Sequence, residues 1–125
     1  FFFFFLADDS CGRSSFENDT SGNISSPNFS PFYGGLKKCN WTIRVPYGNT
    51  ITLQFLEFHL EDHPSCSSYY IEVYDGHAGK FRFLGRYCGQ RFPSFLKSFS
   101  NVVKIIFIGK TQSVFKFHFS SEKSE

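Results

Sequence analysis

Apolar and polar residues alternate along most of the chain from residue 41 onward, which is the pattern of β-strands with one buried and one solvated face. Turn signals such as residues 46–49, 63–65 and the Asp75-Gly76 pair separate the runs, and no stretch has a helical period with caps. Many short strands separated by turns predict an all-β antiparallel sandwich or barrel. The residues expected to face inward are Trp41, Ile43, Val45, Ile51, Leu53, Phe55, Leu56, Phe58, Leu60, Ile71, Val73, Phe81, Phe83, Val103, Ile105, Phe107, Phe115, Phe117 and Phe119.

One of these runs changes phase within a single predicted strand. Its apolar residues occupy odd positions up to Phe55 and even positions from Leu56 to Leu60. A side-chain period of two cannot absorb that change without an inserted residue. We therefore expect a β-bulge near Phe55 and Leu56.

The length of 125 residues fits one domain, which we place at residues 11–120, between a leader remnant or linker at 1–10 and a polar tail at 121–125. Residues 1–7 are similar to the end of a signal peptide, although Phe5 stands where a small residue is preferred, and a hydrophobic linker is the alternative. Phe accounts for 19 residues, most of which we assign to the core rather than to an aromatic ligand site. Nothing approaches 18 consecutive apolar residues, so we expect no membrane span in this chain.

Charge is distributed unevenly along the chain. Residues 1–75 hold nine acids and four bases, a net of −5, whereas residues 76–121 hold eight bases and no acid. Such asymmetry indicates either a polyanion-binding face or the solvated side of alternating strands. The candidate partner-binding or polyanion-binding residues are Arg82, Arg86, Arg91, Lys104, Lys110 and Lys116.

Four cysteines and four glycosylation sequons point to an oxidising compartment. Cys11, Cys39, Cys66 and Cys88 are widely spaced without a CxxC pair, which disfavours a zinc or thioredoxin-like site and leaves three disulfide pairings open. The sequons at Asn18, Asn23, Asn28 and Asn40 lie within 23 residues. The two features together favour a secreted chain or the extracellular part of a cell-surface protein.

The sequence gives little support to catalysis or nucleic-acid binding. It has no nucleophile elbow, P-loop or HExxH motif, so we expect no catalytic residue and no cofactor. Histidines and acids at residues 59–63 have ligand-like spacing, but surface histidines at a strand end explain them better than a metal site. Aromatic and basic residues interleave at residues 81–83 and 115–119, and alternation would send the rings to the core and the cations to solvent. Nucleic acid is therefore not expected, and a sulfated or acidic glycan or an acidic protein could use the cationic side alone.

An ordered set of motifs over residues 11–120 resembles the CUB domain family. The motifs are Cys11-Gly12, residues 21–29 (SGNISSPNF), Cys39-Asn40-Trp41-Thr42-Ile43, residues 71–76 (IEVYDG), Tyr87-Cys88-Gly89 and residues 101–107 (NVVKIIF). The resemblance implies a jelly-roll-like sandwich of two five-stranded antiparallel sheets, similar to the spermadhesins, with disulfides Cys11–Cys39 and Cys66–Cys88. It also implies a non-enzymatic extracellular module that binds a protein or glycan partner. Alternatives are an accessory domain of an extracellular protease and a stand-alone heparin- or polyanion-binding protein similar to spermadhesins.

Many members of this family bind calcium through three acidic residues, and the matching positions here are degenerate. Glu61 fits the first position, but the second is Tyr69 and the third is Lys110. Calcium needs six to eight oxygen ligands, usually with several carboxylates. We therefore expect no calcium site, and we expect the Lys110 ammonium to pair with Glu61 or Asp62 instead.

Overall fold

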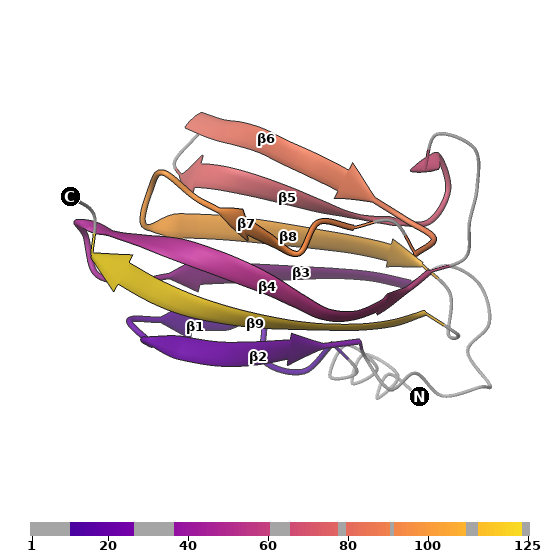
Figure 1. Cartoon of the computed structure of the whole chain (residues 1–125), viewed down its shortest axis with the longest axis horizontal. Coiled ribbons are helices and arrows are strands. Elements are labelled where there is room, and N and C mark those ends of the chain that lie inside the picture. Colours follow the sequence, from indigo (N-terminus) through magenta and orange to yellow (C-terminus); the bar gives the residue numbers. More distant parts are fainter. Residues whose placement is uncertain are drawn as a thin grey trace, which may run out of the picture.

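The computed structural model describes residues 11–26, 37–60, 66–77, 80–90, 92–109 and 113–123, and these residues form two β-sheets without an α-helix. One sheet has five strands in the order β1-β3-β8-β5-β6 and the other has four in the order β2-β9-β4-β7 (Figure 1). The strands are β1 (Ser15–Glu17), β2 (Ser21–Ser25), β3 (Lys37–Arg44), β4 (Asn49–His59), β5 (Tyr70–His77), β6 (Lys80–Tyr87), β7 (Phe95–Lys97), β8 (Val102–Gly109) and β9 (Val114–Lys123).

This architecture is the predicted all-β sandwich, with three differences in detail. Within the described ranges the second sheet has four strands rather than five, and β1 pairs with β3 in parallel rather than antiparallel fashion. Strand β9 also continues through residues 121–123, which we had assigned to a polar tail, because β4 extends far enough to pair with them from Asn49 to Ile51. No helix of the described residues is long and apolar enough to cross a membrane.

The inward faces of the two sheets form one hydrophobic core. Trp41 from the five-stranded sheet meets Phe115 from the four-stranded sheet edge to face, with ring centroids 5.7 Å apart. Phe16 and Phe119 meet across the sheets in the same way, at 5.2 Å. Edge-to-face contacts of this kind add to the stabilisation from burial alone. The alternation seen in the sequence therefore places most of the predicted inward residues in the core.

The predicted bulge in β4 is confirmed, because the β4–β9 register shifts between Phe55 and Glu57. The extra residue is Leu56, which is 47% exposed, so its assignment to the inward face was wrong. Its insertion turns Phe58 and Leu60 inward, where both are buried.

A second bulge, in β6, makes another part of the inward assignment wrong. The β5–β6 register shifts between Val73 and Tyr74, so that Val73 pairs with Gly85 and Tyr74 with Phe83. Leu84 is the additional residue, and it reverses the phase of the first half of β6. Phe81 and Phe83 consequently leave the core and are 42% and 53% exposed.

Disulfides join Cys11 to Cys39 and Cys66 to Cys88, which is the pairing that the resemblance implies. They close loops with sequence separations of 28 and 22 residues. In the chain-entropy model, closing loops of this length stabilises a fold by roughly 3 kcal/mol each.

Candidate functional site

The most unusual surface of the described chain lies along the outermost strand of the five-stranded sheet. We call it the β6 edge patch and define it as Phe81, Arg82, Phe83, Phe99 and Lys104. Phe99 follows β7 and is 74% exposed, the largest exposure of any described Phe. Large apolar side chains gathered at a surface mark interaction sites more often than single exposed ones do.

Two ring–cation contacts lie in the patch, one on each face of β6. The Arg82 guanidinium carbon lies 4.9 Å from the centre of the Phe99 ring, and Lys104 Nζ lies 5.4 Å from that of Phe81. The ring of Phe83 packs against Tyr74 of β5 with centroids 5.4 Å apart. Cation–π contacts of this kind are worth about 0.5–1 kcal/mol at exposed sites. The exposed rings are thus held against neighbours rather than projecting alone.

A buried carboxylate fixes the backbone that carries Phe99. Asp75 is 4% exposed, and its carboxylate accepts hydrogen bonds from the Phe99 N–H at 2.7 Å and the Ser100 N–H at 3.1 Å. It also accepts one from the Ser100 hydroxyl at 2.6 Å. Hydrogen bonds to a charged acceptor are stronger than those between neutral groups. Phe99 is therefore presented to solvent on an ordered segment.

A polar network borders the patch on the outer face of β5 and β6. Arg86 Nε donates to Glu72 Oε2 at 2.8 Å, and the Tyr74 hydroxyl donates to Glu72 Oε1 at 3.1 Å. Arg86 Nη1 donates to the Cys66 carbonyl at 3.2 Å, and its guanidinium carbon lies 4.0 Å from the centre of the Tyr70 ring. The Arg86 side chain thus links Cys66, one half of the Cys66–Cys88 disulfide, to the five-stranded sheet.

The network shifts the titration of its members. Hydrogen bonding to Glu72 raises the pKa of Arg86, and desolvation with a smaller contribution from Glu72 raises the pKa of Tyr74. The charge of Arg86 is thus already matched by Glu72. No described carboxylate forms an ion pair with Arg82 or Lys104.

The structure separates the six residues that we grouped as a possible polyanion site. Arg82 and Arg86 lie on β6 and Lys104 on β8, all in the five-stranded sheet, whereas Lys116 lies on β9 in the other sheet. Arg91 and Lys110 fall outside the described residues. The described members therefore do not share one sheet.

Three of the four sequons lie in the described part of the chain, and their asparagines Asn18, Asn23 and Asn40 are exposed. Asn40 lies on β3, the second strand of the five-stranded sheet, and pairs with Ile106 of β8. Asn28 falls outside the described residues, and so do the expected leader or linker at residues 1–10 and the polar end at 124–125.

Of the three positions of the degenerate calcium site, only Tyr69 is described, and it is half-buried. Glu61, Asp62 and Lys110, with the ion pair expected between them, lie outside the described residues. Three or more His, Cys, Asp or Glu side chains do not come together in the part of the chain that the structure describes.

Two of the surface cavities are lined by described residues alone. A cavity of about 590 Å³ beside β1 and β2 is lined by residues including Arg13, Asp19 and Trp41, and the first two already pair at 3.1 Å. A cavity of about 350 Å³ beside the Cys66–Cys88 disulfide is lined in part by Arg86, Tyr87 and Phe92. Burial raises the pKa of Tyr87. Neither cavity brings together groups suited to acid–base or nucleophilic chemistry.

The sequence prediction missed the exposed rings and the Asp75 clamp. The adjacent apolar pair Phe83-Leu84 is a signal of the same kind as Phe55-Leu56, which did reveal the bulge in β4. Asp75-Gly76 was expected to form a turn, and this was wrong, because both residues continue β5. A buried acid there supports the segment after β7, which is distant in sequence.

Comparisons with known proteins agree with this fold. The family model for the CUB domain matches residues 11–120. Dog cubilin is 39% identical over 113 residues, which cover 90% of this chain and 3% of cubilin. The human tumor necrosis factor-inducible gene 6 protein is 42% identical over 85 residues, 68% of this chain and 31% of that protein. The chain thus spans less than a third of either relative.

A solved structure extends the comparison to three dimensions. The MASP-1 CUB2 domain bound to Ca2+ matches with a TM-score of 0.67 and 25% sequence identity, over 88% of this chain and 99% of that one. The match to the family model, the identities and the sandwich with its two disulfides lead to one conclusion. The chain belongs to the CUB domain family.

Proposed function

We propose that this CUB domain acts outside the cell, secreted or within an ectodomain, and binds a protein partner through the β6 edge patch. CUB domains are typically non-catalytic extracellular modules for protein interaction. The observation that carries the proposal is that Phe81, Phe83 and Phe99 are exposed beside cations that have no described carboxylate partner.

The energetics of interfaces support this choice of surface. A few anchor residues supply most of the binding free energy, and aromatic and Arg side chains are frequent among them. An ordered backbone lowers the entropy lost on binding. Phe99 meets that condition because Asp75 accepts two hydrogen bonds from its segment.

A sulfated glycan is a weaker candidate than a protein. Glycans of this kind are recognised through clustered cations, whereas Arg86 is paired with Glu72 and Lys116 lies in the other sheet. The exposed rings would also remain unused. A role as accessory domain of an extracellular protease is compatible with protein binding and depends on a catalytic domain elsewhere in the protein. N-glycans on Asn18, Asn23, Asn28 or Asn40 and independence from calcium stay predictions.

The experiment screens the multimerised domain against a library of secreted proteins and ectodomains, and then measures each partner with purified variants. We expect Phe99→Ala and Phe83→Ser each to weaken binding at least about tenfold, which corresponds to about 1.4 kcal/mol. Leu56→Ser is the matched control, because Leu56 is comparably exposed but lies on β4 in the other sheet. A partner whose affinity is lowered by Leu56→Ser and not by the two Phe variants would contradict the proposal. To test the glycan alternative, elution from heparin is measured in graded salt. We expect Arg82→Ala to leave this elution unchanged, because we do not expect Arg82 to bind a glycan.

A further inference from the structure

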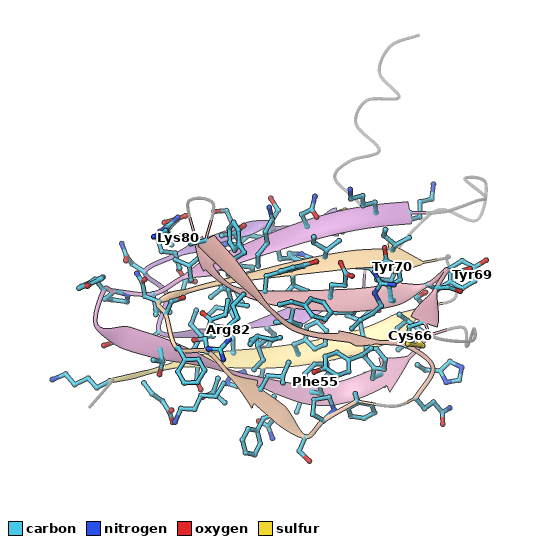
Figure 2. All side chains as sticks on the ribbon, turned by 90° about the horizontal axis from the view of Figure 1, so that it is seen from above. Phe55, Cys66, Tyr69, Tyr70, Lys80 and Arg82 are labelled. Atoms are coloured by element: carbon cyan, nitrogen blue, oxygen red, sulfur yellow. A yellow bond between two sulfur atoms is a disulfide. The ribbon has the colours of Figure 1, made fainter. Side chains whose placement is uncertain are left out.

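Strand β6 ends the five-stranded sheet, and no described strand pairs with its outer edge. It pairs with β5 on one side only, and Figure 2, which looks onto this edge of the sandwich, labels its residues Lys80 and Arg82. Among the described residues, no backbone hydrogen bond outside the strand ladders involves residues 80–87. An unpaired edge of this kind can accept another strand.

The two faces of β6 carry different side chains, cationic on one and aromatic on the other. Arg82 lies opposite Asp75 in the β5–β6 register, and the Asp75 side chain faces the segment after β7, so Arg82 and Lys80 point to that face. Phe81 and Phe83 point to the outer face of the sheet, where they meet Lys104 and Tyr74. A strand added to β6 would meet cations with every second side chain and rings with the others.

The positive charge at this edge favours an acidic partner. Residues 76–121 contain no acid, and the two carboxylates on neighbouring β5 are engaged, Glu72 by Arg86 and Asp75 by Phe99 and Ser100. A second copy of this chain does not fit, because two antiparallel β6 strands would bring the cations of both copies together. Like charges placed opposite each other destabilise a strand pair.

We propose that β6 binds an extended segment of a protein partner by strand addition, and that acidic and apolar residues alternate in this segment. This inference rests on the proposed function and specifies the partner's chemistry. Acidic side chains lie beside Lys80 and Arg82, and apolar side chains lie beside Phe81 and Phe83. The Leu84 bulge, which places the rings on the outer face of β6, thus determines which face of the added strand is apolar and which is acidic.

The first test compares two fluorescein-labelled peptides of identical composition by fluorescence polarisation. One is the alternating Ser-Val-Glu-Ile-Asp-Val-Glu-Ser and the other is the block sequence Ser-Glu-Glu-Asp-Val-Ile-Val-Ser. We expect the alternating peptide to bind at least about tenfold more tightly, with an affinity that falls as salt rises. Equal affinity of the two peptides, or no binding of either, would overturn the inference.

A charge exchange tests the contact with Arg82. We expect Arg82→Glu to lose affinity for the acidic alternating peptide and to gain it for Ser-Val-Lys-Ile-Arg-Val-Lys-Ser, which the unmodified chain should not bind. Gln54→Glu, at an exposed position of β4 in the other sheet, is the control that should change neither affinity. Circular dichroism and urea unfolding of each variant establish that it is folded. Loss of the acidic peptide without gain of the basic one contradicts a direct contact with Arg82.

Backbone methylation separates strand addition from side-chain docking. Two versions of the alternating peptide carry N-methyl groups on alternate residues, so that only one version keeps the N–H groups that face β6. We expect one version to bind and the other not to bind. If both bind equally, strand addition is wrong while the proposed function stands. The proposed function has its own test: it is wrong if Phe83→Ser and Phe99→Ala do not weaken the binding of the partners found in the screen.

Discussion

Asp75 connects the chemistry of a single residue to the shape of the β6 edge patch. Replacing it with Ala leaves the part-buried N–H groups of Phe99 and Ser100 without their acceptor. Unsatisfied buried donors cost about 1–3 kcal/mol each, and some of that cost is relieved by water. We expect Asp75→Ala to lower the free energy of unfolding by about 3 kcal/mol in urea titrations.

Ser100→Ala is the matched control for this prediction. It removes the hydroxyl that donates to Asp75 and also accepts from the Val102 N–H, and it keeps the N–H groups of residues 99 and 100 paired with Asp75, so a loss of about 1 kcal/mol is expected. Equal losses in the two variants would mean that the carboxylate does not hold the segment through its backbone. Asp75→Ala should also weaken partner binding more than Ser100→Ala, because Phe99 then becomes mobile.

At the scale of the element, the two bulges decide which residues form the core. Deleting Leu56 removes the extra residue, and Phe55 and Phe58 then lie two positions apart, so that Phe58 and Leu60 stay on the inward face. The deletion removes an exposed side chain and the local bend of the bulge, but it keeps the large apolar residues buried. We expect the deletion variant to fold, as measured by secretion and by cooperative unfolding.

The substitution Leu56→Ser keeps the extra residue and removes only an exposed side chain. Its effect on the free energy of unfolding should be within about 0.5 kcal/mol, since Leu56 is 47% exposed. A deletion variant that is not secreted, or that unfolds without cooperativity, would mean that the bend of β4 at the bulge is itself required for the fold.

The two bulges also mark how far the sequence pattern reaches. In β4 the apolar set itself changes phase, so the bulge could be predicted from the residues alone. In β6 the adjacent Phe83-Leu84 pair signals a change of phase, but it does not say which half of the strand faces the core. Only pairing with β5 decides that Phe81 and Phe83 face solvent, and pairing between strands is a long-range property. The sequence pattern therefore predicted most of the core and missed the candidate site.

At the scale of the whole molecule, the motif order implied more than periodicity could. Periodicity left the choice between sandwich and barrel open, and the cysteine count left three disulfide pairings open. The family resemblance pointed to the sandwich and to the pairing found. The strand number of each sheet and the parallel β1–β3 pair depend on packing between distant segments. Neither follows from the motifs of the individual strands.

We predict that this chain does not bind calcium, in contrast to the MASP-1 CUB2 domain, which was solved bound to Ca2+. A phenol at residue 69 and an ammonium at residue 110 replace two carboxylates of the family pattern and leave Glu61. We expect the melting temperature to be the same within about 1 °C in excess calcium chloride and in EGTA. An intact site at a calcium concentration of about 100 times its Kd would add about 2.7 kcal/mol, a shift on the order of 10 °C for a domain of this size.

The double variant Tyr69→Asp with Lys110→Asp turns this expectation into a two-sided test. It restores the carboxylates that the family pattern requires, so its melting temperature should rise with calcium while that of the unmodified chain does not. Magnesium, which prefers a tighter octahedral site, should produce little of the effect. A calcium-dependent rise in the unmodified chain would show that other oxygen ligands complete a site. A double variant without any response would mean that residues 69 and 110 are not the positions that the ion requires.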